Sequence, residues 1–162
     1  MTLISRLFAA LTFAAAMASP ALADTTAALS LFRVTQTIQI VNGEPVQSRE
    51  LIPATTSTPG DRLLYRITLT NQDEIEAEDI ILTLPIDAAV TFIEESLTAT
   101  VELEASFSTD EGQTFAPLAD LVVSENGETR SATTEDLTAM RLTVPALAAK
   151  SDALIDYEIT VE

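Results

Sequence analysis

The sequence contains no cysteine, no histidine and no tryptophan. Without cysteine no disulfide can form, so the stability of the fold must come from burial and hydrogen bonding. Ser-His-Asp and Cys-His catalytic arrangements are impossible, and zinc and copper sites lose their usual ligands. Glycine is scarce as well, with four in the chain, and neither a P-loop nor a G-x-G-x-x-G motif occurs. An enzyme built from this chain would have to work with carboxylates alone.

Positive charge is also scarce, since 8 Lys and Arg stand against 25 Asp and Glu. Binding to nucleic acid needs a basic patch that neutralises phosphates, and binding to anionic lipid needs the same. We therefore expect no nucleic-acid partner. An acidic surface favours solubility and, among ligands, cationic groups or metal ions.

The first residues are typical of a secretory signal peptide. Arg6 precedes the apolar run at residues 7–18, Pro20 follows it, and residues 21–23 read Ala-Leu-Ala. The run of about a dozen residues is shorter than the roughly 20 that a membrane-spanning helix needs. We predict a signal peptide at residues 1–23 and one domain at residues 24–162, exported to the periplasm or secreted, with no membrane anchor after cleavage. The charge of that domain is 7 − 25 = −18.

Apolar residues recur at every second position, which is the period of a strand with one buried face. The pattern is found at residues 63–69, 80–84, 101–107 and 155–161. Residues 32–41 and 46–52 flank Asn42-Gly43, the strongest short hairpin signal. Further strands are expected at residues 90–94, at 114–118 continuing to 123, and at 138–144. Many short strands without helical crossovers predict a sandwich or a barrel, and at most a single helical turn fits residues 146–150.

Residues 59–96 contain several short motifs in a familiar order. They are Pro59-Gly60-Asp61, a Y-R-I-T-L-T-N strand that ends at Asn71, a Leu84-Pro85 corner and an F-I-E-E-S strand that ends at Ser96. This order, with the closing strand at residues 155–161, resembles the bacterial cell-envelope repeat called domain of unknown function eleven. The family usually has a glycine soon after the asparagine, where Gln72-Asp73-Glu74 stands here, and another where this chain has Lys150.

The resemblance implies an immunoglobulin-like fold, a role in the cell envelope and no catalytic residues. We therefore predict an all-β, immunoglobulin-like antiparallel β-sandwich of about seven to nine strands. The expected function is an exported, non-enzymatic envelope module with a structural or protein-interaction role, whose partner is an unknown envelope protein. The polar loop at residues 124–136 is the expected contact surface. A calcium-stabilised binding module is the main alternative, and a carboxylate-based glycosidase is a remote one.

Acidic side chains crowd two turns and make calcium the possible cofactor. The candidate ligands are Asp73, Glu76 and Asp79 in one turn and Asp110 in another. Calcium takes six to eight oxygen ligands, but neither stretch has the glycine that an EF-hand loop needs at its sixth position. A charge run at the end of a sandwich is more often simply solvated.

Residues 108–115, STDEGQTF, resemble the Asp-box of sialidases and other β-propellers. A glycosidase needs two carboxylates about 5–10 Å apart, and acidic pairs are too plentiful here for one pair to be informative. The chain holds one copy of the motif and is too short for a propeller. We interpret the stretch as a structural turn in which Ser108 and Thr114 bond across the neck, Asp110 accepts backbone N–H groups, Gly112 takes a positive φ and Phe115 returns to the apolar layer.

Overall fold

A computed structural model describes residues 25–41, 44–125 and 127–162. The predicted signal peptide and the Asn42-Gly43 turn lie outside the described residues. The strands are β1 (Thr25–Val41), β2 (Glu44–Pro53), β3 (Arg62–Asn71), β4 (Ala77–Pro85), β5 (Val90–Ala99), β6 (Glu104–Ser108), β7 (Val122–Glu125), β8 (Glu128–Ser131), β9 (Ala139–Leu147) and β10 (Asp152–Val161). Two short 3₁₀ turns, η1 (Leu118–Asp120) and η2 (Thr134–Asp136), are the helical elements of the described chain.

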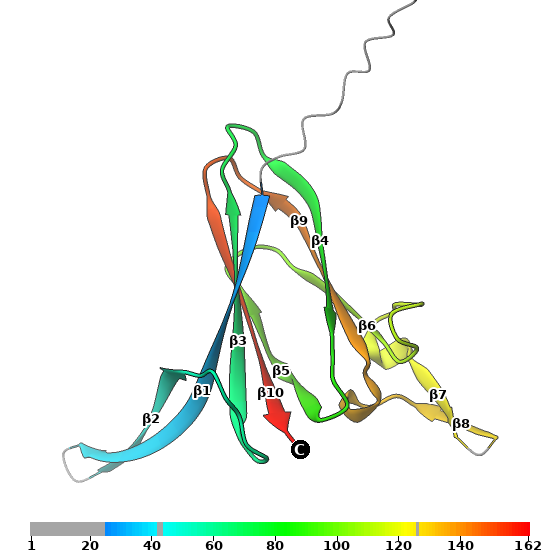
Figure 1. The fold of residues 1–162 in the computed structure, drawn as a ribbon, viewed down its shortest axis with the longest axis horizontal. Helices are drawn as coiled ribbons and strands as arrows, with labels where there is room; N and C mark the ends of the chain where they lie inside the picture. Colours follow the sequence, from blue (N-terminus) through cyan, green and yellow to red (C-terminus); the bar gives the residue numbers. More distant parts are fainter. Residues whose placement is uncertain (1–24, 42–43, 126) are drawn as a thin grey trace, which may run out of the picture.

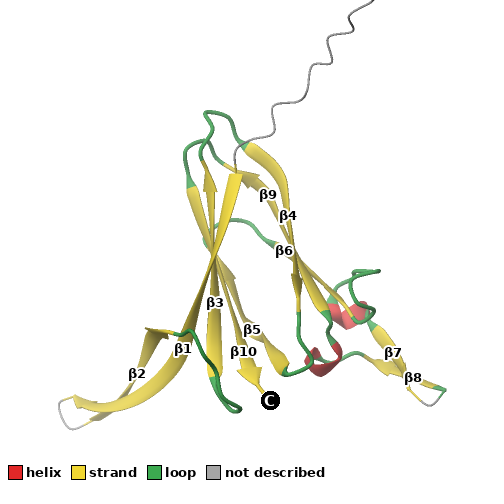
Figure 2. Ribbon diagram, in the orientation of Figure 1, coloured by secondary structure: helices red, strands yellow, loops and turns green. Residues whose placement is uncertain are grey.

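The strands form two antiparallel sheets that pack as a sandwich (Figures 1 and 2). The larger sheet has the order β2-β1-β3-β10-β5, the smaller has the order β4-β9-β6, and β7 and β8 make a separate hairpin. The predicted all-β antiparallel sandwich is confirmed. The described residues form ten strands rather than seven to nine, because β2 extends one sheet and the β7–β8 hairpin lies beside the sandwich.

The connectivity differs from that of an antibody constant domain, in which the last strand lies at a sheet edge. Here β10 lies between β3 and β5. The β3–β4 and β9–β10 connections meet at the end of the sandwich shown uppermost in Figure 1, where the Lys150 N–H donates to the Asp73 carbonyl at 3.0 Å. Asn71 closes this end, because its buried amide donates to the carbonyls of Ile75, Leu147 and Ala148 at 2.8–3.1 Å.

The core lies between the sheets and follows the alternation read from the sequence. β3 contributes Leu63, Ile67 and Leu69, all buried, and β10 contributes Ile155 and Ile159. Tyr65 and Tyr157 stack at 5.1 Å between ring centroids, and Phe92 packs against Tyr157 and Phe107. Four of the aromatic side chains thus form one cluster, at a point where β3, β10, β5 and β6 contribute inward positions.

Three predicted segments were wrong. Residues 114–123 do not form one strand: Ala116 makes a single bridge to Phe107, the η1 turn follows, and β7 begins at Val122. The interval 124–136 is not a plain loop, because it contains the rest of the β7–β8 hairpin and the η2 turn. The two strands of this hairpin pair although most of their residues are polar, so the alternation of apolar residues does not reveal them. The Ala146–Leu147 stretch belongs to β9 instead of a helical turn.

The strand β1 is long and serves two partners. Its first part, up to Arg33, pairs with β3, and its second part, from Phe32 onward, pairs with β2. The second part and β2 form a two-stranded ribbon that projects from the sandwich (Figure 1). Arg49 on β2 therefore reaches the outer face of the larger sheet from the side. Among the described residues no helix is long and apolar enough to cross a membrane.

Candidate functional site

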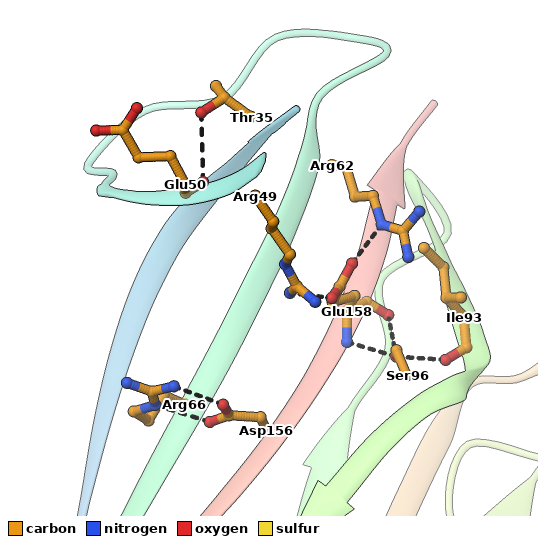
Figure 3. Close-up of polar contacts among 9 residues, drawn as sticks. All are labelled: Thr35, Arg49, Glu50, Arg62, Arg66, Ile93, Ser96, Asp156 and Glu158. Carbon is orange, nitrogen blue, oxygen red and sulfur yellow. Dashed lines mark hydrogen bonds and ion pairs between the residues drawn. The ribbon is translucent and has the colours of Figure 1, made fainter. Parts of the chain in front are cut away.

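A cleft of about 440 Å³ lies on the outer face of the larger sheet. Figure 3 shows the polar lining residues Arg49, Arg62, Arg66, Ser96, Asp156 and Glu158. The ribbon strand β2 supplies Arg49 to one side, and β3 and β10 form the floor with outward-facing residues. The bulged strand β5 forms the other side. The lining residues are Arg49, Leu51, Arg62, Leu64, Arg66, Ile93, Glu95, Ser96, Thr98, Asp156 and Glu158.

Glu158 is the centre of the cleft. It points away from the core, yet it is only 3% exposed. The two carboxylate oxygens are held by different arginines, Oε1 by Arg49 and Oε2 by Arg62. A buried carboxylate is costly unless it is paired and hydrogen-bonded, so these two arginines are what allow Glu158 to lie here. Because Arg49 comes from the ribbon, the pair also ties the ribbon to the sandwich.

A second ion pair extends the cleft along the sheet. Arg66 and Asp156 are cross-strand neighbours on β3 and β10. They form a bidentate ion pair, in which Nε lies 2.8 Å from Oδ1 and Nη2 lies 2.6 Å from Oδ2. The hydrogen bonds from Arg66 to Asp156 raise the pKa of the guanidinium. The Arg66 guanidinium also lies 5.6 Å from the centroid of the Phe32 ring. Such a paired and stacked arginine is held in one orientation.

An irregularity in β5 shapes the wall opposite the ribbon. The pairing of β10 with β5 jumps from Asp156–Thr98 to Glu158–Ile93, so the residues between Ile93 and Thr98 bulge outward. Ser96 bridges the bulge, because its Oγ accepts the Glu158 N–H at 2.7 Å and donates to the Ile93 carbonyl. Bulges commonly redirect side chains beside binding sites. Here the bulge brings Ser96 and Glu95 to the rim of the cleft.

The charge balance of the cleft differs from that of the whole chain. Its lining has three arginines and three acids (Glu95, Asp156 and Glu158), so it is formally neutral, whereas the chain has a net charge of −17. Arg49 and Arg62 each make one hydrogen bond to Glu158 among the described residues, while a guanidinium carries five N–H groups. Both side chains are nearly half exposed, so donors remain on the solvent side of the cleft.

The predicted calcium ligands are divided between two places. Asp73, Glu76 and Asp79 belong to the β3–β4 connection and the start of β4, whereas Asp110 follows β6. Within the described ranges, no group of three or more acidic side chains is arranged to hold a metal ion. The Asp73 N–H donates to Asn71 Oδ1 at 3.0 Å. This turn therefore belongs to the hydrogen-bond network by which Asn71 closes the end of the sandwich. Calcium binding stays a prediction.

Asp110 organises the turn that follows β6. Its Oδ1 accepts from Ser108 Oγ and from the backbone N–H groups of Gln113 and Thr114, and its Oδ2 accepts from Thr114 Oγ1 at 2.6 Å. These bonds, those to Thr114 foremost, lower the pKa of Asp110 to about 2. Ser108 and Thr114 thus both bond to Asp110 instead of to each other, and Gly112 has a φ of +82°. The oxygens that calcium would need are engaged inside the turn.

Phe115 does not return to the core as expected from the motif. Its ring lies against the Arg141 guanidinium, 3.8 Å from the ring centroid, and Gly112 is close to the same ring. A Cβ on Gly112 would lie 3.6 Å from the Phe115 ring, so the turn and the ring pack closely. Phe115 therefore covers the outer surface of the smaller sheet.

The residues of the cleft were missed in the sequence. In the alternation around residues 63–69, Arg62 and Arg66 fall on the outward side, but nothing in the sequence connects them with Glu158 or Arg49. Arg62 and Arg49 are separated from Glu158 by 96 and 109 residues in the sequence. One signal was available, because Arg49 and Arg66 fall on predicted strands and Arg62 directly precedes one. In comparisons with protein-family models, with curated proteins and with solved structures, no match was found.

Proposed function

We propose that this chain is an exported, non-enzymatic module of the cell envelope that holds a protein partner in the arginine-lined cleft. The observation that carries the proposal is the convergence of Arg49, Arg62 and Arg66 on one cleft, in a chain with 8 basic and 25 acidic residues. The absence of histidine and cysteine removes the common catalytic groups, which favours binding over turnover. The predicted signal peptide and the resemblance to a cell-envelope repeat support the location.

The chemistry of the cleft indicates what the partner presents. Guanidinium groups held in fixed orientations bind carboxylate or carbonyl oxygens through several N–H donors at once. Arg66 is fixed by Asp156, and Arg49 and Arg62 are fixed by Glu158, so little side-chain entropy remains to be lost on binding. The formally neutral cleft is also where an acidic or acceptor-rich segment meets the least repulsion from this acidic chain.

Site-specific photo-crosslinking in intact cells tests the proposal. A photoreactive residue in place of Glu95 lies at the cleft rim, and one in place of Val122, 59% exposed on the β7–β8 hairpin, is the matched control. The expected result is one envelope protein, identified by mass spectrometry, that crosslinks at position 95 and not at 122. Arg62→Gln should reduce this product, whereas Arg130→Gln, which breaks an exposed Arg–Asp pair outside the cleft, should not.

Two outcomes would show the proposal to be wrong. One is the recovery of the same proteins from both positions. The other is the recovery of no crosslinked protein at position 95 from cells in which the chain is intact and folded. A thermal melt of each variant separates loss of binding from loss of the fold, because Arg62→Gln also removes one of the two partners of Glu158.

A further inference from the structure

The strand β4 is an edge of the smaller sheet. Among the described residues it pairs with β9 on one side and with no strand on the other. In an antiparallel strand, every second residue directs its N–H and C=O away from the partner. From Ile80 to Leu84 the edge therefore carries main-chain groups that can pair with another strand. No backbone bond outside the sheet involves these residues.

The middle of this edge lacks the usual protection against pairing, which Glu78, Asp79 and Pro85 provide near its ends. Natural edge strands carry charged residues, prolines or bulges that discourage the addition of another strand. Residues 80–84, Ile-Ile-Leu-Thr-Leu, contain none of these. Ile81 is 58% exposed on the outer side, and Ile80, Leu82 and Leu84 on the inner side are only partly buried. The apolar inner row is thus incompletely covered.

The larger sheet, which faces the smaller one across the core, extends farther than the β4 edge. Leu29 on β1 is 59% exposed, although it pairs with Ile67 and shares its inward direction. Leu29 and Leu84 line the same cavity of about 260 Å³, together with Tyr65, Phe92 and Tyr157. The inner face of β1 therefore lies alongside the free edge of β4. A strand added to β4 would cover Leu29 and place one side chain in this aromatic cavity.

Charge indicates what kind of strand fits. Glu78 and Asp79 precede the uncharged stretch, and Asp87 follows it on the wall of the cavity. A partner strand is therefore expected to have alternating apolar residues with lysine or arginine at its ends. A second copy of this chain fits less well, since antiparallel pairing of two β4 strands would bring Glu78 and Asp79 of each copy near Asp87 of the other.

We propose that the free edge of β4 is a docking site for an extended, basic-ended strand of a partner protein, which becomes a fourth strand of the smaller sheet. The main chain from Ile80 to Leu84 supplies hydrogen bonds, and Leu29 with the aromatic cavity selects apolar side chains. This site lies between β1 and β4, apart from the arginine-lined cleft. A result that contradicts one of the two proposals therefore leaves the other unaffected.

The test uses the whole protein and a labelled synthetic peptide in which valine alternates with threonine, with one central phenylalanine and lysines at both ends. Fluorescence anisotropy measures binding, and hydrogen exchange locates it. Those amides of Ile80–Leu84 that point away from β9 should become protected, and the same peptide with proline at alternate positions should not bind. Leu29→Ser should weaken binding roughly tenfold, from the lost burial of one leucine. Val122→Ser, at an equally exposed valine, should leave binding unchanged.

Three results would overturn the proposal. Protection could appear on β2 or β5 and not on β4, which would place the strand at another edge. The peptide with glutamates at its ends could bind as tightly as the one with lysines, which would remove the charge argument. Protection of Ile80–Leu84 could also rise with protein concentration in the absence of peptide, which would make a second copy the occupant. Hydrogen exchange of β3 core amides reports in each case whether the fold is intact.

Discussion

The two edges of the smaller sheet, β6 and β4, differ in whether another described segment covers them. Beyond β6, the chain returns and covers the edge: Phe107 and Ala116 exchange backbone hydrogen bonds at 2.8 and 3.0 Å, and the Asp110 turn closes the connection between them. Phe115 then packs on Arg141 beside the same edge. Beyond β4, no described segment makes such a return. The core side chains differ accordingly, because Phe107 is buried whereas Ile80, Leu82 and Leu84 are partly exposed.

The difference teaches that a polar turn can cover a sheet edge, in addition to the apolar burial of Phe107. Ser108 is fully buried and bonds to Asp110 and Gly112, so the turn is anchored from inside the sheet. Thr138 completes the anchor, because its N–H donates to the Ser108 carbonyl and its Oγ1 accepts the Glu111 N–H. A motif that resembles an Asp-box thus functions as an edge cover. The β4 edge has no equivalent in the described chain, which is what makes it available to a partner.

The largest expected effect comes from removing the aromatic anchor of the covered edge. Phe107→Ala should lower the free energy of unfolding by about 3–5 kcal/mol, since it deletes a buried ring that packs on Phe92. Leu82→Ala on the open edge should cost clearly less, because Leu82 is partly exposed. Urea unfolding of both variants measures the difference. Equal costs would mean that the β4 edge is as well packed as the β6 edge.

Ser108→Ala should come next. It leaves Asp110 and Gly112 N–H groups without their buried acceptor, which should cost about 1–3 kcal/mol of unfolding free energy. Ser124→Ala on the exposed hairpin is the matched control and should stay within about 0.5 kcal/mol of the wild type. Chemical denaturation reports both values. If the two variants were equally stable, the inner anchor of the turn would have no energetic role.

How far the sequence could predict this molecule follows from the range of the interactions involved. Alternation within β3, β4 and β10 is local, and it correctly predicted the inward rows and the all-β class. The connection between Phe107 and Ala116 contains a recognisable short motif, so a turn could be predicted there. The single bridge at Ala116 and the η1 turn after it could not. Glu158 finds Arg49 and Arg62 only after β10 is placed beside β3 and the ribbon curves over the sheet. Such contacts depend on topology, which alternation does not encode.

Low pH should destabilise the covered edge, because the Asp110 carboxylate becomes protonated. The pKa of Asp110 is about 2 in the folded protein, below its ordinary value of 3.8. A lowered folded-state pKa contributes stability above the unfolded pKa and loses it as pH falls through the folded pKa. The melting-temperature gap between wild type and Asp110→Asn should therefore be full above about pH 4 and narrow toward about pH 2. A gap that does not change over this interval would contradict the role of the Asp110 carboxylate.

The smallest expected effect concerns the end of the sandwich next to the open edge. Lys150 has a φ of +53°, in the left-handed region that a side chain disfavours, and it stands where the resemblance to the envelope repeat expects glycine. Lys150→Gly should therefore stabilise the fold by up to about 1 kcal/mol, although it removes the bond from Lys150 Nζ to the Gln72 carbonyl. Glu111→Gly, at a φ of +60° in the covered edge, is the matched substitution. A gain at position 111 without one at 150 would show that the Nζ bond outweighs the backbone strain, and that the side chain of Lys150 fastens the β3–β4 connection from which the open edge begins.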